Sequence, residues 1–387
     1  MASIPLPQGW TWETLVERLG SFDNLERSAR ATGAIHRARV VKTASQLLRL
    51  ILAYVLGGLS FRSVAAWAEA GSHASMSDVA LLKRVKQAGP WLRHIVGVLT
   101  ARSGANPACD TDGRRVVAVD ATMICTPGDK KNYHLLHTVY DLTKQCFRGT
   151  ELTDRHTAEA LDVCGVEKGE IRLGDRAYGR WRDLSAVVGA GADYLVRLSA
   201  NALKLRTPTG DKVGRGALCQ RSEYEGVLDE TVTIHATAGK DKMEARLIVL
   251  ALPPAQAAEA RRVMRQKARK WGYTPSQEAL ATAACLMLIT SLPRETWPAS
   301  RLLALYRRRW QVELAFKRLK SLIGLEELRV HDADLVNAWI HAVILVALLI
   351  DLDRPSQHRE GPDSPPRTHR VASRSRSGVT SHRCVCA

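Results

Sequence analysis

The sequence predicts an α/β protein, in which a helical N-terminal region precedes a mixed sheet that is interrupted by a β-rich stretch. Three observations support this prediction. Apolar residues recur at helical spacing within residues 1–108. Runs of β-branched residues then follow one another and later alternate with helix-like segments, which is typical of a mixed sheet. Strand-like patterns dominate from about residue 200 to 291, and the helix expected at 299–322 needs a sheet to cover.

In the N-terminal region, the apolar spacing predicts helices over residues 44–60, 60–70 and 77–89. The first should stop at Gly57–Gly58, and the third should begin with Ser77 as its N-cap and end at Gly89–Pro90. Lys83 and Arg84 on the third helix are candidate DNA contacts, because three short basic helices can form a helix-turn-helix-like reader. A helical bundle that packs on the next domain explains the same pattern equally well.

The first part of the sheet follows. Strands are expected over residues 114–126, 133–142, 146–153, 170–179 and 192–199. The strand that starts at residue 170 should break at Gly174–Asp175, and residues 154–164 resemble a helix. Asp120 and Asp175 then stand at strand ends, where sites of α/β proteins are commonly built. Asp120 interrupts an apolar strand, so its carboxylate is either paired or functional.

Residues beyond 200 complete the predicted organisation. One helix-like piece, 255–270, carries six basic residues within an otherwise β-rich insertion. The tail has seven arginines, scattered Pro and Ser, and no periodicity, so we expect it to be disordered. The resulting parts are a helical DNA-binding region (1–108), the first part of a catalytic core (109–200), the β-rich insertion (201–291), the second part of the core (292–352) and a basic tail (353–387).

Charge and composition narrow the functional classes. The net charge of +17 indicates a polyanionic partner. DNA is favoured over a membrane, because the most apolar run, residues 342–350, is too short to cross a bilayer and predicts a core helix. The start of the chain lacks the pattern of a secretory signal, and eight cysteines without a C-x2-C pair indicate reduced thiols. We therefore expect a cytoplasmic protein that works at the nucleoid.

Residues 305–320, "LYRRRWQVELAFKRLK", hold six cations and one acid, Glu313. On a continuous helix, Tyr306, Arg309, Glu313 and Lys320 fall within an arc of about 60°. That arc lies in the apolar sector, which normally faces the body of a protein. Either Arg309 and Glu313 form a buried ion pair, or Glu313 binds metal in a cleft whose cations bind phosphate.

Asp120, Asp175 and Glu313 are the three acids with unusual placement. Three carboxylates in a basic cleft suit one chemistry in particular. Two Mg²⁺ ions roughly 3.5–4 Å apart can activate a water or a 3′-hydroxyl and stabilise the leaving oxygen during attack on a phosphodiester. Mg²⁺ prefers carboxylate oxygens and keeps several waters, so the site would need no Cys or His.

The sequence resembles DDE transposases of bacterial insertion sequences, in the branch with the Y-R-E-K signature (insertion sequence four type). Tyr306, Arg309, Glu313 and Lys320 match the signature in its spacing. "VVAVDATMICTPG" around Asp120 and "LGDRAYG" around Asp175 resemble the segments that hold the first two catalytic acids of this family. The likeness covers roughly residues 40–352.

The resemblance implies a ribonuclease-H-like core in which Asp120, Asp175 and Glu313 chelate two Mg²⁺ ions, for which Mn²⁺ can substitute. It implies strand cleavage at transposon ends and strand transfer into target DNA, within a synaptic homodimer. The residues expected to contact DNA are Tyr306, Arg309, Lys320, Lys317, Arg176, Lys83 and Arg84. Two alternatives stay open: a DNA-binding protein that descends from a transposase and is no longer catalytic, and a Mg²⁺-dependent DNA endonuclease with the same fold.

Overall fold

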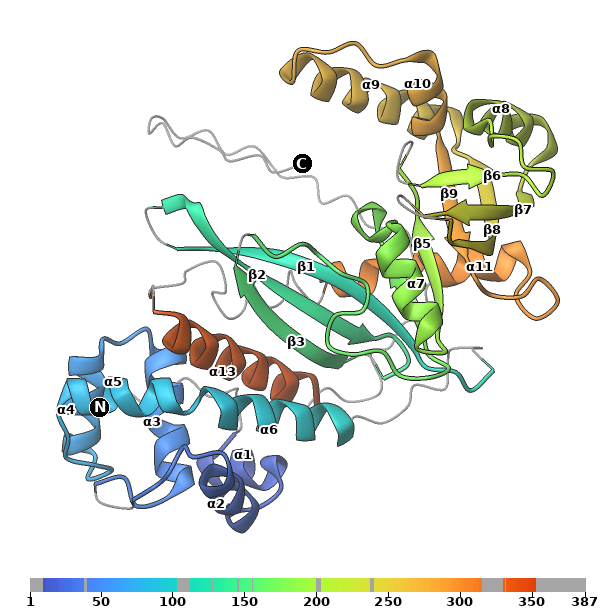
Figure 1. Ribbon diagram of the computed structural model, residues 1–387. Coiled ribbons are helices and arrows are strands. Elements are labelled where there is room, and N and C mark those ends of the chain that lie inside the picture. The colour runs from blue at the N-terminus through green and yellow to red at the C-terminus, as the bar shows by residue number, and fades with distance from the viewer. Residues whose placement is uncertain are drawn as a thin grey trace. The chain divides into compact units, whose positions relative to one another are not determined.

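The structure is a computed structural model (Figure 1). It describes residues 10–37, 40–102, 112–126, 129–144, 146–154, 156–199, 203–236, 240–314, 330 and 332–352. The predicted basic tail, 353–387, lies outside the described residues, as do Lys317 and Lys320 of the predicted site.

The N-terminal region is helical, as predicted. Its helices are α1 (Trp12–Leu19), α2 (Phe22–Ala31), α3 (Ala44–Gly57), α4 (Phe61–Ala70), α5 (Asp78–Gln87) and α6 (Gly89–Arg102). The chain leaves α3 through Gly58, whose φ of 62° lies in the left-handed region that glycine tolerates. Ser77 caps α5, since its hydroxyl accepts the Ala80 N–H at 3.2 Å. Helix α5 ends at Gln87, two residues before the predicted stop, and Gly89–Pro90 begins α6, where the missing N–H of proline costs nothing.

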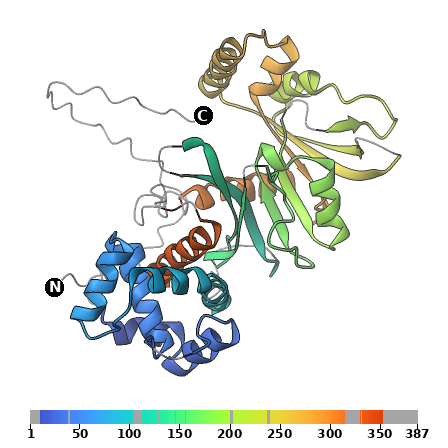
Figure 2. The same ribbon diagram turned by 60° about the vertical axis from the view of Figure 1, so that its left-hand side comes forward.

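Helix α13 (Ala333–Leu352) brings the far end of the described chain back to the N-terminal helices. It packs against α3, α5 and α6, and both α6 and α13 contact β3 (Cys146–Asp154). Figures 1 and 2 show the two helices side by side along this strand. The apolar run 342–350 is therefore a core helix, as predicted, and its Val343, Ile344 and Leu345 are fully buried. Among the described residues, no helix is long and apolar enough to cross a membrane.

Within the described part of the chain, nine strands form one mixed sheet, in the order β3-β2-β1-β4-β5-β9-β8-β7-β6. Strands β1, β4 and β5 run parallel, and every other neighbouring pair is antiparallel. Besides β3, the strands are β1 (Val116–Thr126), β2 (Asp129–Asp141), β4 (Ile171–Gly174), β5 (Asp193–Arg197), β6 (Lys204–Arg206), β7 (Leu228–His235), β8 (Lys242–Ala251) and β9 (Cys285–Thr290). This is the α/β, ribonuclease-H-like architecture that the sequence predicts.

The strands of the β-rich insertion lengthen this sheet. β9 pairs antiparallel with β5, placing Thr290 opposite Leu195, and β8, β7 and β6 follow outward. The helices of the second half are α7 (Trp181–Gly189), α8 (Arg215–Glu225), α9 (Pro254–Lys270), α10 (Gln277–Ala283) and α11 (Ala299–Arg307). The sequence predicted α9 but neither α8 nor α10.

Two apolar layers lie on opposite faces of the sheet, because successive side chains of a strand point to opposite sides. Val116 and Ala118 join the layer that contains α3, α6, α11 and α13. Val117 and Val119 join the layer that contains α7 and α8. Alternation along β1 puts Asp120 on the same face as Val116 and Ala118, toward α11.

The predicted helix over 154–164 is wrong, because its described residues form turns and loops. Arg172 on β4 explains the difference. Its buried guanidinium donates to the carbonyl oxygens of Leu161, Val163 (3.0 Å) and Gly165, which a helix would have used internally. Asp154 adds to the effect, since its carboxylate accepts the N–H of Thr157 at 3.0 Å.

Candidate active site

Asp120 lies in the middle of β1 and not at the end of a strand, so that part of the prediction is wrong. The strand continues to Thr126 because β2 pairs with it along its whole length. Its parallel partner β4, however, pairs only up to Ala118, opposite Leu173. Asp120 therefore stands just beyond the last parallel pair, where one side of the strand becomes free for a site.

Asp175 follows β4 directly, as predicted. The register between β1 and β4 has an offset of 55 residues, so Asp120 and Asp175 are level across the two strands. The Asp175 carboxylate accepts the Ala177 N–H at 2.8 Å and caps a short 3-10 helix, Arg176–Tyr178. The strand end and this cap hold the second carboxylate beside the first.

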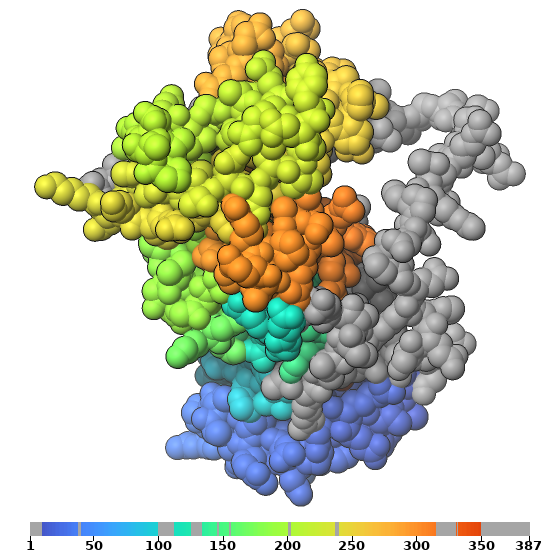
Figure 3. Space-filling view, turned by 90° about the vertical axis from the view of Figure 1, so that its right-hand side faces the viewer, coloured from blue at the N-terminus to red at the C-terminus, as the bar shows by residue number. Residues whose placement is uncertain are grey.

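The signature segment is not one continuous helix, and this corrects the predicted arc. Helix α11 ends at Arg307, residues 308 and 309 form a turn, and residues 310–314 are helical again. At the interruption the Arg309 N–H bonds the Tyr306 carbonyl, and the Val312 N–H bonds that of Arg309, so the chain is wound more tightly there. Figure 3 shows the segment with α11 in orange, exposed on one face of the molecule.

Arg309 brings two of the predicted acids together. Its guanidinium lies 2.5 Å from Glu313 Oε1 and 3.8 Å from Asp120 Oδ2. It also lies 5.9 Å from the centre of the Tyr306 ring. Tyr306 is buried and only 17% of the Arg309 side chain is exposed, but the Glu313 side chain is 52% exposed. Tyr306 and Arg309 therefore face the body of the protein, as predicted for this arc, whereas the Glu313 side chain lies at its exposed edge.

The pKa of Asp120 also indicates that Asp175 and Glu313 lie near it. Burial raises the pKa of its carboxyl to about 6, and the nearby charges of Asp175 and Glu313 raise it as well. The Ala121 N–H, 2.9 Å from Asp120 Oδ1, and the Arg309 cation act in the opposite direction. A carboxylate that repels two neighbouring carboxylates is in a site that favours an added cation.

The donor set suits a hard divalent metal, since the three acids offer only carboxylate oxygens. As they stand, no three acidic, histidine or cysteine side chains in the described ranges are close enough together to hold an ion. Arg309 lies between Asp120 and Glu313 and supplies the positive charge there. The acids thus fit such a metal in kind, and two of them, Asp120 and Glu313, contact Arg309 in this structure.

Two groups near the site, Arg197 and Glu159, were not identified by the sequence analysis. Arg197, the last residue of β5, has a buried Nε without a hydrogen-bond partner among the described atoms. Burial and the Arg197 charge both lower the pKa of Arg176. Burial and the Asp175 charge raise the pKa of Glu159. Arg197 could have been recognised from the strand pattern, because it is a cation at the end of the strand that pairs with β4. Nothing in the sequence around Glu159 indicates that this residue lies near the site.

The other predicted contacts lie apart from the carboxylates. Lys83 is exposed on the outer side of α5, and Arg84 is half-buried on the same helix. Lys86 of that helix bonds Asp332 at 2.6 Å. Trp310, which follows Arg309, is 51% exposed.

Comparison with known proteins gives a consistent result. The family described as "Transposase DDE domain" matches residues 111–349. The transposase for insertion sequence element IS421 of Escherichia coli is 38% identical over 369 residues, which are 92% of this chain and 96% of the relative. A protein named as a transposase for IS186A in Escherichia coli K12 gives the same identity and coverage. The transposase for IS231F of Bacillus thuringiensis is 24% identical over 204 residues.

Proposed function

The chain belongs to the family of transposases with a DDE domain, and we propose that Asp120, Asp175 and Glu313 are its three catalytic carboxylates. It is a transposase of the insertion-sequence type, which cleaves DNA at the ends of its element and transfers the strand to target DNA. The observation that supports this choice of residues is the position of Arg309, within 3.8 Å of both Asp120 and Glu313.

Enzymes with this domain depend on a divalent metal. We propose Mg²⁺, with Mn²⁺ as a substitute, since three carboxylates are the ligands that hard cations prefer. When bound, two such ions supply the activated water or 3′-hydroxyl and the stabilised leaving oxygen of an in-line displacement. Support comes from the register of β1 and β4, which puts Asp120 and Asp175 level, and from Arg309, which contacts both Asp120 and Glu313.

Arg309 exchanges partners when DNA binds. Without DNA, its guanidinium balances Asp120 and Glu313. A phosphate of the transposon end is a stronger bidentate partner for guanidinium than one distant carboxylate. Transfer of Arg309 to the phosphate frees the two carboxylates for metal, so binding of DNA and assembly of the metal site are coupled. Tyr306 supports this exchange: burial raises the pKa of its phenol, so the hydroxyl stays protonated and can donate to an anion.

Further contacts complete the proposal. Arg176, Lys317 and Lys320 would hold the DNA backbone near the carboxylates, and Lys83 and Arg84 of α5 would contact the transposon end. Two copies would meet in a synaptic homodimer, which acts at the nucleoid. Lys83→Ala should weaken end binding and lower its salt dependence by about one phosphate contact. An unchanged salt dependence would remove Lys83 from the interface.

The decisive experiment uses a labelled duplex of the element's own ends with Mg²⁺, and compares the unmodified protein with Glu313→Gln. We expect site-specific nicks with a 3′-OH, made by the unmodified protein alone. Binding without nicks by either protein would favour the non-catalytic DNA-binding alternative. Nicks that are never followed by strand transfer would favour the endonuclease.

A further inference from the structure

Helix α9, in the β-rich insertion, carries a positive charge that has no role in the proposed catalytic site. It contains six basic residues and one acid, Glu259, within Pro254–Lys270. Only Ala257 and Ala268 of this helix are buried. Figures 1 and 2 both show α9 projecting beyond the strands of the sheet. Most of the helix surface therefore faces solvent and is positively charged.

The cations of α9 fall into two groups. Arg262 bonds Glu259 at 2.6 Å, and Arg261 lies 3.8 Å from Glu223 on α8. The remaining cations are exposed, and no acid in the described part of the chain forms an ion pair with them; they are Arg265, Lys267, Arg269 and Lys270. Like charges this close repel one another, so an anionic partner would stabilise the helix.

Two aromatic side chains extend this charged surface. Trp271, which follows α9, is 71% exposed, and Tyr273 is 53% exposed. A single exposed ring needs no explanation, but these two rings directly follow four exposed cations in the sequence. Cations combined with flat aromatic faces are the composition that binds nucleic acid, through phosphates and through sugars or bases. We call Arg265, Lys267, Arg269, Lys270, Trp271 and Tyr273 together the α9 surface.

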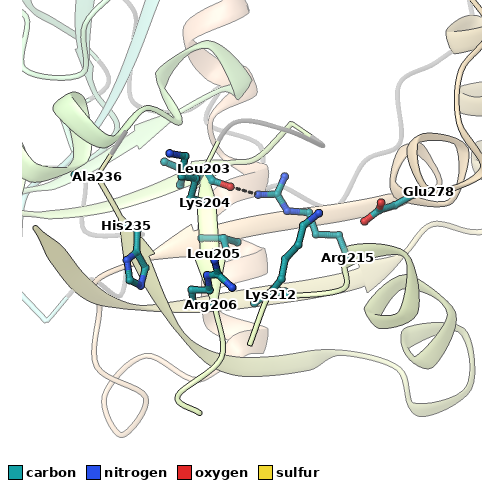
Figure 4. A pocket seen from close by; sticks show the side chains of 10 residues that line it. Leu203, Lys204, Leu205, Arg206, Lys212, Arg215, His235, Ala236 and Glu278 are labelled. Atoms are coloured by element: carbon teal, nitrogen blue, oxygen red, sulfur yellow. Dashed lines mark hydrogen bonds between the residues drawn. The ribbon is translucent and has the colours of Figure 1, made fainter. Parts of the chain in front are cut away.

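The base of α9 borders a hollow region that is also basic. A cavity of about 570 Å³ lies between α8, α9 and α10 and is lined by Arg261 and Arg265. A second cavity of about 450 Å³ is lined by Lys204, Arg206, Lys212 and Arg215 (Figure 4). Glu278 of α10 lines both cavities. The Arg215 guanidinium already donates a hydrogen bond to the Leu203 carbonyl at 2.6 Å. Positive charge thus continues from α9 to strand β6.

We propose that the α9 surface binds target DNA without regard to sequence. Its cations can contact phosphates, and its aromatic rings can lie against any sugar or base, but neither kind of contact distinguishes one sequence from another. Recognition of the transposon ends requires base reading, whereas a target is held chiefly by its backbone. A protein partner would bury Trp271 in an apolar patch, but among the large apolar side chains of α9 only Val263 is exposed.

The test compares two double variants of the same helix. Arg265→Ala/Arg269→Ala removes two unpaired cations, and Glu259→Ala/Arg262→Ala removes an ion pair and leaves the net charge unchanged. All four replacements favour helix, so α9 should persist in both proteins. Each is assayed with an unrelated duplex, with the end duplex, and for nicking and strand transfer into a plasmid.

We expect the first variant to bind the unrelated duplex roughly tenfold more weakly, with a salt slope lower by about two. Strand transfer should fall in the same proportion, and end nicking should stay within twofold of the unmodified protein, as should every activity of the control. Strand transfer that is unchanged, or a control that loses as much, would overturn the proposal. An equal loss of end binding would reject target DNA as the partner. Nicking by the unmodified protein tests the catalytic assignment separately.

The contribution of the aromatic rings to DNA binding is tested with a separate matched control. Tyr224 on α8 is 89% exposed, but it stands between Glu223 and Glu225. Trp271→Ala should lower affinity for the unrelated duplex at least fivefold, and Tyr224→Ala should leave it unchanged. Equal effects of the two variants would show that exposed aromatic rings, and not the α9 surface, determine the binding.

Discussion

Arg309 lies 3.8 Å from Asp120, across the gap between the turn after α11 and the middle of β1. The contact joins the last part of the DDE domain to its first strand. It also places a cation between two of the carboxylates that we propose as metal ligands, so their charge is partly balanced in this structure.

Asp120→Asn should abolish cleavage and leave end binding intact. An amide of the same size keeps the packing on β1 but loses the negative charge that a metal needs. Removal of one member of a catalytic unit costs roughly three orders of magnitude or more in rate. Nicking of the end duplex measures the loss, and Asp211→Asn, in an exposed turn, is the control. Cleavage that persists in Asp120→Asn would reject the metal assignment.

The same substitution should stabilise the protein at neutral pH. The pKa of Asp120 is about 6 in the folded chain, against an ordinary value of 3.8. Between these values the folded state holds a proton that the unfolded state has released, so this group lowers the stability as pH rises from about 4 to 6, and the penalty then stays constant. Asp120→Asn removes that penalty, which is on the order of 1–3 kcal/mol at pH 7.5.

Urea unfolding in the presence of a chelator checks this prediction. The gain in unfolding free energy should be largest at pH 7.5 and smaller at pH 5, where Asp120 is already mostly protonated. A gain that is the same at both pH values would mean that burial does not shift this group.

Arg309→Ala should weaken assembly on the transposon end and lower the salt slope of end binding by about one. Lys320→Ala, outside the described residues, should have the same effect if it contacts a phosphate. Arg309→Lys keeps the charge but cannot bind phosphate in a bidentate manner, so the slope should recover while cleavage stays reduced. Equilibrium binding at several salt concentrations separates the variants. A slope that both alanine variants leave unchanged would contradict the phosphate contacts.

Arg172→Met should be strongly destabilising. The side chain is fully buried, bonds Glu170 at 2.6 Å and holds three carbonyl oxygens of the 161–165 segment. Its loss leaves these carbonyl groups without their donor and leaves buried Glu170 with Arg148 as its remaining partner, which costs about 3–5 kcal/mol. Denaturant unfolding measures the change. Arg262→Met, which breaks an exposed ion pair, should change stability by less than about 1 kcal/mol.

Local signals predicted much of this fold. Ser60 and Ser77 begin helices because a hydroxyl before an apolar run caps the first turn, and Gly58 ends one because it tolerates the left-handed conformation. Alternation of apolar residues located the strands around Asp120 and before Asp175. The spacing of Arg309 and Glu313 predicted an ion pair as one of two alternatives, and the pair forms, although the Glu313 side chain is 52% exposed.

Failures of prediction came from partners distant in sequence. The 154–164 segment has helical composition, but Arg172 takes its carbonyl groups. Asp120 was placed at a strand end because the apolar run stops there, although β2 continues the pairing to Thr126. Helix α8 has little apolar periodicity, because its buried residues are Arg215, Cys219 and Ser222. The turn at 308–309 has no Gly or Pro to indicate it.

The short strand β6 has a consequence for how copies of this protein can meet. It forms one edge of the sheet, and such edges expose backbone groups that can recruit a strand from another molecule. β6 has three residues, with Lys204 and Arg206 exposed on either side of buried Leu205, and Lys212 bridges back to Arg206. A short, charged edge resists aggregation by strand addition. Copies of this chain that come close together on the same DNA are therefore protected from joining their sheets along this edge.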